Sequence, residues 1–346
     1  MKTNFVKLRW LFTMLLFVTT MIMPTMMLAK SIDLKIPEGD GAGTPYKIGT
    51  AEELYWFAGL VNGTLPGVKK DLSANAILTD DIIVNTGVLD PNKDLVSGND
   101  FIEWIPIGKS SSDDDAYTGT FDGNGHTISG LYFNKSNSWY VGLFGCIGAE
   151  GKISNVGVSD SYFQSSNCPY IGGVCGSNSG ELQNCSNSST VIGKENEYRI
   201  GGVCGDNYEG PITNCYYLSG TVADGKGGIG GKDDENGKAV EMSKDRFKSG
   251  EVAWLLNGSK SVSTEESTLA WYQKLGENAD AYPVLKSTDH NTVYKAPLFS
   301  CDGTTRIGEY ANKPEGDKLS HNYQMAEKAD EGTSNLYSEE CAICHN

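Results

Sequence analysis

The chain has 346 residues, of which 42 are glycine and 11 are proline, and 39% are hydrophobic. This composition is rich in glycine without the proline content of collagen or of disordered tracts, and a chain of this length can bury a substantial core. A formal net charge of −16 argues against nucleic-acid binding, because phosphate contacts need a basic surface.

Residues 1–29 have the layout of a secretory signal peptide. An apolar run over 10–23 follows three basic residues and leads to small residues at Ala29, where cleavage is expected. The alternative is an anchoring transmembrane helix, although the run is short for a full span and no later stretch approaches 18 apolar residues. The three basic residues are Lys2, Lys7 and Arg9. Cleavage would remove their positive charges and change the net charge of the chain from −16 to −19.

The first elements predicted after the leader are a helix and two strands. Thr50 and Glu53 form a capping-box pattern, which predicts a helix over 51–61. Strand-like segments at 76–84 and 104–107 are expected to form the first coil of a β structure.

Related segments then recur with a period near 30 residues, and a partial copy at 121–131 precedes them. Each has a closing glycine and, further on, an asparagine. Short β-branched and aromatic runs alternate with Gly, Asn and Ser turns and lack helical periodicity, which predicts short strands. The recurring residues are Gly145, Gly176 and Gly205, and Asn155, Asn184 and Asn214.

This period predicts a parallel β-solenoid, in which each coil stacks on the previous one at about 4.8 Å. We expect the glycines to supply positive φ at corners and the asparagines to form a hydrogen-bonded ladder. The competing fold, a β-propeller, usually needs longer blades. The predicted class is therefore all-β, a right-handed parallel β-solenoid (β-helix) with short helical capping elements and a small Cys/His tail.

The predicted organisation has four parts. A signal peptide occupies 1–29, the solenoid with its N-terminal helical cap occupies 30–240, a C-terminal cap occupies 241–297, and a polar tail occupies 298–346. The C-terminal cap is expected to contain a helix over 243–256, which Gly250 weakens. Strands at 270–275 and 282–285 would complete this cap.

The repeats around 171–191 and 200–222, with the segment 121–131, resemble the GLUG motif. The flanking segments 45–54 and 250–257 resemble those beside such repeats in secreted proteins of Bacteroidetes. The resemblance implies an adhesin-like secreted or surface protein with a β-helix body. It carries over no catalytic residue, because the motif has no known chemistry.

No catalytic motif is recognisable. The four histidines do not form the His-Glu-x-x-His pattern of a zinc peptidase, and no Gly-x-Ser-x-Gly elbow is present. The chain is therefore predicted not to be an enzyme. The alternative is a polysaccharide lyase or glycosidase on the solenoid, which would gather carboxylates on one face; the candidates Glu150, Glu181 and Glu209 fall at offsets that differ by two residues.

Two acidic runs, 113–115 and 233–235, are calcium-binding candidates. Solvated loops are the favoured interpretation, because spaced ligands are missing. Asp122 and His126 lie in a turn and are predicted to be structural.

The cysteines form two groups. In the repeats, Cys175 and Cys204, and likewise Cys185 and Cys215, occupy equivalent positions, so they are either stacked disulfides or an interior ladder of reduced thiols. Cys146 and Cys168 fit neither register.

The tail contains Cys301, His321, Cys341 and Cys344, a set that can complete a tetrahedral zinc site. Cys-x-x-Cys-His at 341–345 also matches the c-type haem attachment pattern, but almost no chain follows it to build a haem pocket. Disulfides or free thiols are the remaining interpretation. The abrupt end after Asn346 is also consistent with a piece of a longer protein.

These observations predict a secreted or cell-surface, non-catalytic binding protein of the adhesion type. Stacked repeats favour extended surfaces over a single pocket, and the suspected partners are host glycans or matrix and surface proteins. A passive surface spacer is a further alternative. Aromatic residues that can stack on sugars, or else fill the core and turns, are Trp139, Tyr208, Tyr216 and Tyr217.

Overall fold

The computed structural model describes Lys30, the main part of the chain in nine segments, and the backbone of four further strands. The nine segments are 32–112, 114–136, 138–166, 170–193, 199–222, 227–230, 238–258, 269–274 and 280–284, and the strands are 296–299, 306–310, 323–325 and 339–341. The predicted signal peptide lies outside the described residues.

Short parallel strands dominate the structure. The first turn holds β1 (Tyr46–Ile48), α2 (Ala51–Asn62), β2 (Ala76–Leu78) and β3 (Ile82–Ile83). Three complete coils of five strands each follow. Their strands are β4 (Thr120–Asp122), β5 (Thr127–Ser129), β6 (Tyr132–Asn134), β7 (Tyr140–Val141) and β8 (Phe144–Ile147); β9 (Lys152–Ser154), β10 (Gly157–Ser159), β11 (Tyr162–Gln164), β12 (Tyr170–Gly172) and β13 (Cys175–Asn178); and β14 (Glu181–Gln183), β15 (Ser186–Asn187), β16 (Thr190–Ile192), β17 (Ile200–Gly201) and β18 (Cys204–Asn207). The last turn holds β19 (Ile212–Thr213), β20 (Cys215–Leu218) and β21 (Ala239–Met242).

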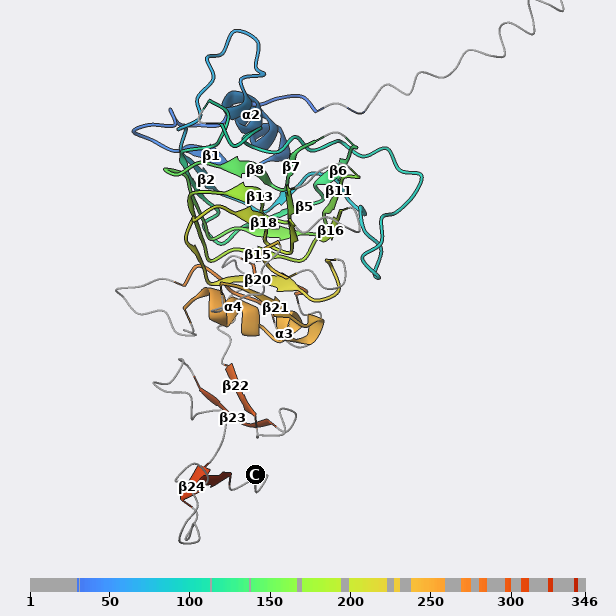
Figure 1. Ribbon diagram of the computed structural model, residues 1–346, viewed down its shortest axis with the longest axis vertical. Helices are drawn as coiled ribbons and strands as arrows, with labels where there is room; N and C mark the ends of the chain where they lie inside the picture. Colours follow the sequence, from blue (N-terminus) through green and yellow to red (C-terminus); the bar gives the residue numbers. More distant parts are fainter. Residues whose placement is uncertain are drawn as a thin grey trace, which may run out of the picture. The chain divides into compact units, whose positions relative to one another are not determined.

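The prediction of a parallel β-solenoid is confirmed. Each complete coil contributes one strand to each of five sheets, and the sheets run from turn to turn, as in the order β1-β2-β4-β9-β14-β19. The strands make about five turns in all, stacked as Figure 1 shows. β21 extends one of these sheets past residue 240, where the solenoid was predicted to end.

Equivalent side chains of successive coils form the core. Phe121 stands in register with Ile153, Ile153 with Leu182, and Leu182 with Ile212, and all four are buried. Burying one such side chain is worth about 1.5–3 kcal/mol. The repeated apolar positions in the sequence are therefore the interior columns of the solenoid.

Helix α2 is present as predicted and covers the first turn (Figure 1). The Thr50 hydroxyl accepts a hydrogen bond from the Glu53 N–H at 3.3 Å, whereas the Glu53 carboxylate accepts from the Gly49 N–H at 2.9 Å and pairs with Lys35 at 2.7 Å. Burial alone would raise the pKa of Glu53, but the Lys35 ammonium and backbone N–H groups lower it on balance. The carboxylate is thus held in its charged form at the start of the helix.

The first-turn strands are shorter than predicted. The segment 76–84 contains the two separate strands β2 and β3, and the prediction of a strand over 104–107 is wrong. Only isolated bridges occur there, Glu103 to Tyr132 and Ile107 to Phe144. Pro106 lacks the N–H that a continuous strand ladder requires.

The predicted asparagine ladder is confirmed. Asn214 Nδ2 donates to Asn184 Oδ1 at 2.7 Å, and Asn184 Nδ2 donates to Asn155 Oδ1 at 3.0 Å. Asp122 receives the Asn155 amide at 2.9 Å at one end, and Asn214 donates to the Leu255 carbonyl at 3.1 Å at the other. A continuous chain of side-chain hydrogen bonds therefore connects successive turns to the C-terminal cap.

The role predicted for the repeat glycines is wrong. Positive φ at the corners belongs to the ladder asparagines, with φ of 53–54°, because Asn tolerates this region better than most residues. The closing glycines are needed for close approach: a Cβ on Gly205 would lie 2.5 Å from the Gly176 carbonyl oxygen.

We expect Asn184→Gly to lower the free energy of unfolding by about 1–3 kcal/mol, because it keeps the backbone conformation but leaves ladder partners unsatisfied. Asn184→Ala should cost roughly 1 kcal/mol more, since Ala disfavours positive φ. Urea unfolding measures both. Gln183→Ala, on the exposed neighbouring position, is the matched control. Equal stability of Asn184→Gly and the control would contradict the role of the ladder.

The C-terminal cap contains two short helices, α3 (Lys244–Lys248) and α4 (Glu251–Leu256), and not the predicted continuous helix. Gly250 adopts a left-handed conformation with φ of 83° and separates them. They lie beyond β20 and β21 (Figure 1) and share a small core with Trp271. In place of the two predicted strands, one antiparallel bridge joins Tyr272 to Val284.

A loop of the first turn reaches the C-terminal cap. The Lys93 ammonium pairs with Asp160 at 2.7 Å, hydrogen-bonds the Tyr282 hydroxyl and lies 4.9 Å from the centre of the Tyr282 ring. The Thr190 hydroxyl donates to the Lys93 carbonyl at 2.6 Å. Burial lowers the pKa of Lys93, but Tyr282 and Asp160 raise it on balance. We call this contact the Lys93 clasp.

Four strands are described in the predicted tail region. β22 (Ala296–Phe299) pairs antiparallel with β23 (Arg306–Tyr310), and β24 (Tyr323–Met325) pairs antiparallel with β25 (Glu339–Cys341). β22 crosses the predicted boundary at residue 297. None of the helices in the described residues has the length and apolar character needed to cross a bilayer.

Candidate ligand-binding surface

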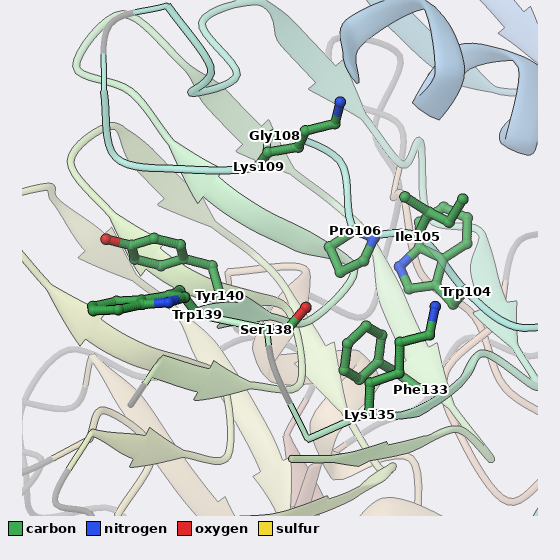
Figure 2. A pocket seen from close by; sticks show the side chains of 10 residues that line it. All are labelled: Trp104, Ile105, Pro106, Gly108, Lys109, Phe133, Lys135, Ser138, Trp139 and Tyr140. Carbon is green, nitrogen blue, oxygen red and sulfur yellow. The ribbon is translucent and has the colours of Figure 1, made fainter. Parts of the chain in front are cut away.

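A cleft of about 190 Å³ lies where the first turn meets the first complete coil. One wall comes from the irregular segment 104–109 and the other from residues 133, 135 and 138–140, in and beside β6 and β7 (Figure 2). The lining side chains belong to Trp104, Ile105, Pro106, Lys109, Phe133, Lys135, Ser138, Trp139 and Tyr140, with Gly108 between them.

Buried contacts hold the first wall in place. Trp104 is fully buried, and its Nε1 donates to the Gly142 carbonyl at 3.0 Å. Asn62, the last residue of α2, donates from Nδ2 to the Pro106 carbonyl at 2.9 Å and accepts from the Gly108 N–H at 3.0 Å. The wall formed by 104–109 is therefore anchored by buried hydrogen bonds to α2 and to the first complete coil.

Trp139 provides the exposed aromatic surface of the cleft. Its side chain is 67% exposed, and it lies beside Tyr140 at one end of the cleft, with Phe133 and Lys135 toward the other end (Figure 2). An indole group exposed to this extent gains little from folding, whereas it offers a large rigid contact area to a ligand.

A column of stacked side chains continues from Tyr140 along the solenoid. The Tyr140 and Tyr170 rings stack at 4.8 Å with an interplanar angle of 18°, and the Arg199 guanidinium lies 4.7 Å from the centre of the Tyr170 ring. The Tyr140 hydroxyl hydrogen-bonds Ser111 at 2.9 Å. Each of the three successive coils thus contributes one planar side chain, Tyr140, Tyr170 or Arg199, to the same stacked column.

Of the residues in the cleft and the Tyr140 column, only Trp139 was identified from the sequence as a candidate for ligand binding. Tyr216 and Tyr217 prove to be buried, and Tyr208, 72% exposed, follows β18 and is not one of the residues that line the cleft. The column had a signal in the sequence, because Tyr140, Tyr170 and Arg199 each come directly before a repeat segment. Trp104 had none, since it lies outside the repeats.

The carboxylates proposed for an enzymatic face do not stand in one register. Glu181 pairs with Lys152 of the previous coil, at a side-chain distance of 3.8 Å, and Lys152 stands opposite Thr120. Glu150 and Glu209 lie in turns outside these strands. The offset of two residues in the sequence therefore remains in the structure.

The acidic and histidine candidates have structural contacts. Asp115 pairs with Lys70 at 2.5 Å, and this contact lowers the pKa of the Asp115 carboxyl. Asp122 Oδ1 accepts from the Asn124 N–H and from the ladder. The backbone carbonyl of the buried His126 accepts the Gly157 N–H of the next coil. Asp113 and residues 233–235 lie outside the described residues.

The repeat cysteines are buried free thiols, which matches the second of the two predicted alternatives. Cys175 stands opposite Cys204 in register, Cys185 and Cys215 are likewise free and buried, and Cys146 is buried. Burial, with a smaller contribution from the neighbouring thiols, raises the pKa of Cys175 and Cys215 well above the usual value. Cys168 lies outside the described residues.

We expect Cys175 and Cys215 to resist iodoacetamide near pH 8 in the folded chain and to react in urea, because the thiolate is the reactive form and burial disfavours it. Thr213→Cys, at an exposed position two residues from Cys215, is the control and should react in the folded state. Mass spectrometry of peptides measures the labelling. Rapid native labelling at Cys175, or a Cys175–Cys204 disulfide, would contradict the assignment.

The proposed zinc ligands of the tail are not brought together in the described part of the chain. Cys341 ends strand β25, of which only the backbone is described, and Cys301, His321 and Cys344 lie outside the described residues. Within the described ranges, no three His, Cys, Asp or Glu side chains are grouped so that they can hold a metal ion. Zinc binding by the tail stays a prediction.

No protein-family model matches the chain. A segment of 84 residues, 24% of the chain, is 38% identical to part of halomucin from Haloquadratum walsbyi, and a segment of 78 residues, 22% of the chain, is 33% identical to part of a protein of Evansella cellulosilytica provisionally named as a Gly-rich membrane protein. These matches span 1% and 9% of the two relatives.

Among solved structures, the chain is similar to a crystal structure of a Bacteroides ovatus protein provisionally named as an immunoglobulin A1 protease. The TM-score is 0.32 and the sequence identity 15%, over 72% of this chain and 98% of that one. A similarity at this level carries no argument about fold or activity.

Proposed function

We propose that the chain is a secreted, cell-surface binding protein of the GLUG-motif repeat type, which adheres to host glycans or to matrix and surface proteins and is not an enzyme. The observation that carries the proposal is the exposed Trp139 in a preformed cleft, at the head of the column formed by Tyr140, Tyr170 and Arg199.

The repeated geometry supports a binding role. A solenoid presents equivalent side chains at a constant spacing, so that an extended ligand can contact several coils at once. Exposed aromatic groups on a rigid frame supply much of the binding energy at interfaces.

Two further observations support a surface location. The leader pattern in residues 1–29 is that of an exported protein. The names of the two similar proteins, halomucin and a Gly-rich membrane protein, also fit an extracellular or surface setting.

The test is a binding screen of the full exported chain against immobilised glycans and matrix proteins, with reaction products measured in the same wells. We expect saturable binding without product, and we expect Trp139→Ala to weaken it at least about tenfold, since a central Trp contributes on the order of 2 kcal/mol or more.

Tyr208→Ala is the matched control, because Tyr208 is an equally exposed aromatic residue outside the cleft. It should bind as the unmodified chain does. Product formation would replace the proposal with a carbohydrate-active enzyme. Unchanged binding by Trp139→Ala would remove the cleft from the proposal, and a screen without binding would favour a surface spacer.

A further inference from the structure

We infer that the Trp139 cleft binds a single sugar residue that carries a carboxylate, as a uronic acid does, within a longer glycan. The inference rests on the proposed function and specifies the ligand class. It is argued from the size of the cleft, its chemical surface and its charge.

The size of the cleft favours one sugar ring. Its volume of about 190 Å³ is below the roughly 300–1,000 Å³ of pockets that enclose drug-sized ligands. One end is the exposed Trp139, so neighbouring sugars of a chain can leave the cleft toward the Tyr140 column (Figure 2).

The surface of the cleft matches the two kinds of surface on a pyranose. The ring faces of a pyranose are apolar C–H surfaces, which pack on flat groups such as Trp139 and Pro106. Its edges carry hydroxyls, for which Ser138 and the Lys135 ammonium provide hydrogen-bonding partners, whereas the Lys109 ammonium points away toward Asn62. An aromatic group with an apolar body and polar neighbours is suited to a ligand of this mixed character.

The charge of the cleft favours an acidic sugar. Its lining contains Lys109 and Lys135 and no aspartate or glutamate, in a chain whose net charge is −16. Lys109 Nζ donates to the Asn62 backbone carbonyl at 2.6 Å, and a neutral partner does not cancel its charge. The nearby Asp115, whose pKa Lys109 also lowers, is paired with Lys70.

Lys135 is the residue of the cleft that can exchange partners. Its ammonium pairs with Glu103 at 2.7 Å, and its side chain is 55% exposed. An exposed ion pair of this kind contributes little to stability. A ligand carboxylate can therefore take the Lys135 ammonium, and it gains a charge-assisted hydrogen bond at small cost to the fold.

The test is isothermal titration calorimetry of the full exported chain with a hyaluronan tetrasaccharide, which contains glucuronate, and with the same tetrasaccharide after its carboxyls are reduced to alcohols. We expect the acidic form to bind at least about tenfold more tightly, with the difference decreasing as salt is added.

Three variants separate the contributions. Lys135→Met should remove the preference for the acidic form and leave the weaker binding of the neutral form in place. Trp139→Ala should weaken both forms, and Tyr208→Ala should change neither. Circular dichroism and urea unfolding confirm that each variant is folded.

Equal binding of the acidic and the reduced tetrasaccharide would overturn the inference. So would the absence of binding to both forms. In that case, Trp139-dependent binding of other ligands in the screen would still support the proposed function. A screen in which no ligand binds would contradict both the proposed function and this inference.

Discussion

The parallel, in-register stacking of coils is the constraint on which the rest of the structure depends. Because each strand pairs with its equivalent in the next coil, residues of the same type at equivalent repeat positions stack into a column along the solenoid. Apolar residues form the core in this way, and polar residues must find their partners along the column. The asparagine ladder meets this need, since each amide both donates and accepts.

How far the sequence predicts such a molecule depends on whether a feature repeats. The period near 30 residues was sufficient to predict the solenoid, the interior columns and the ladder at Asn155, Asn184 and Asn214. The role predicted for the glycines was wrong, because positive φ and close backbone approach both favour glycine and the sequence alone does not distinguish them. Gly205 shows this, since its missing Cβ makes room for the Gly176 carbonyl.

Features that occur once were predicted less well. The segment 104–107 has the composition of a strand, but it lies between α2 and the first complete coil and pairs only at isolated bridges. Its side chains were therefore not expected at a cleft. The cleft exists because the regular stack begins there: an irregular wall, tied to α2 by Asn62, faces the first copy of the repeat. Trp139 could be named from its type, whereas its partners needed the three-dimensional arrangement.

The Lys93 clasp has a consequence for the order in which the chain matures. A solenoid can add coils one after another as the polypeptide emerges, since each coil needs only its neighbour. The clasp joins residues 189 positions apart in the sequence, so the loop that contains Lys93 can contact Asp160 and Thr190 early but gains its last partner only when Tyr282 has been synthesised. The earliest turn is thus completed last, and a chain truncated before Tyr282 would stack its coils but hold this loop only through Asp160 and Thr190.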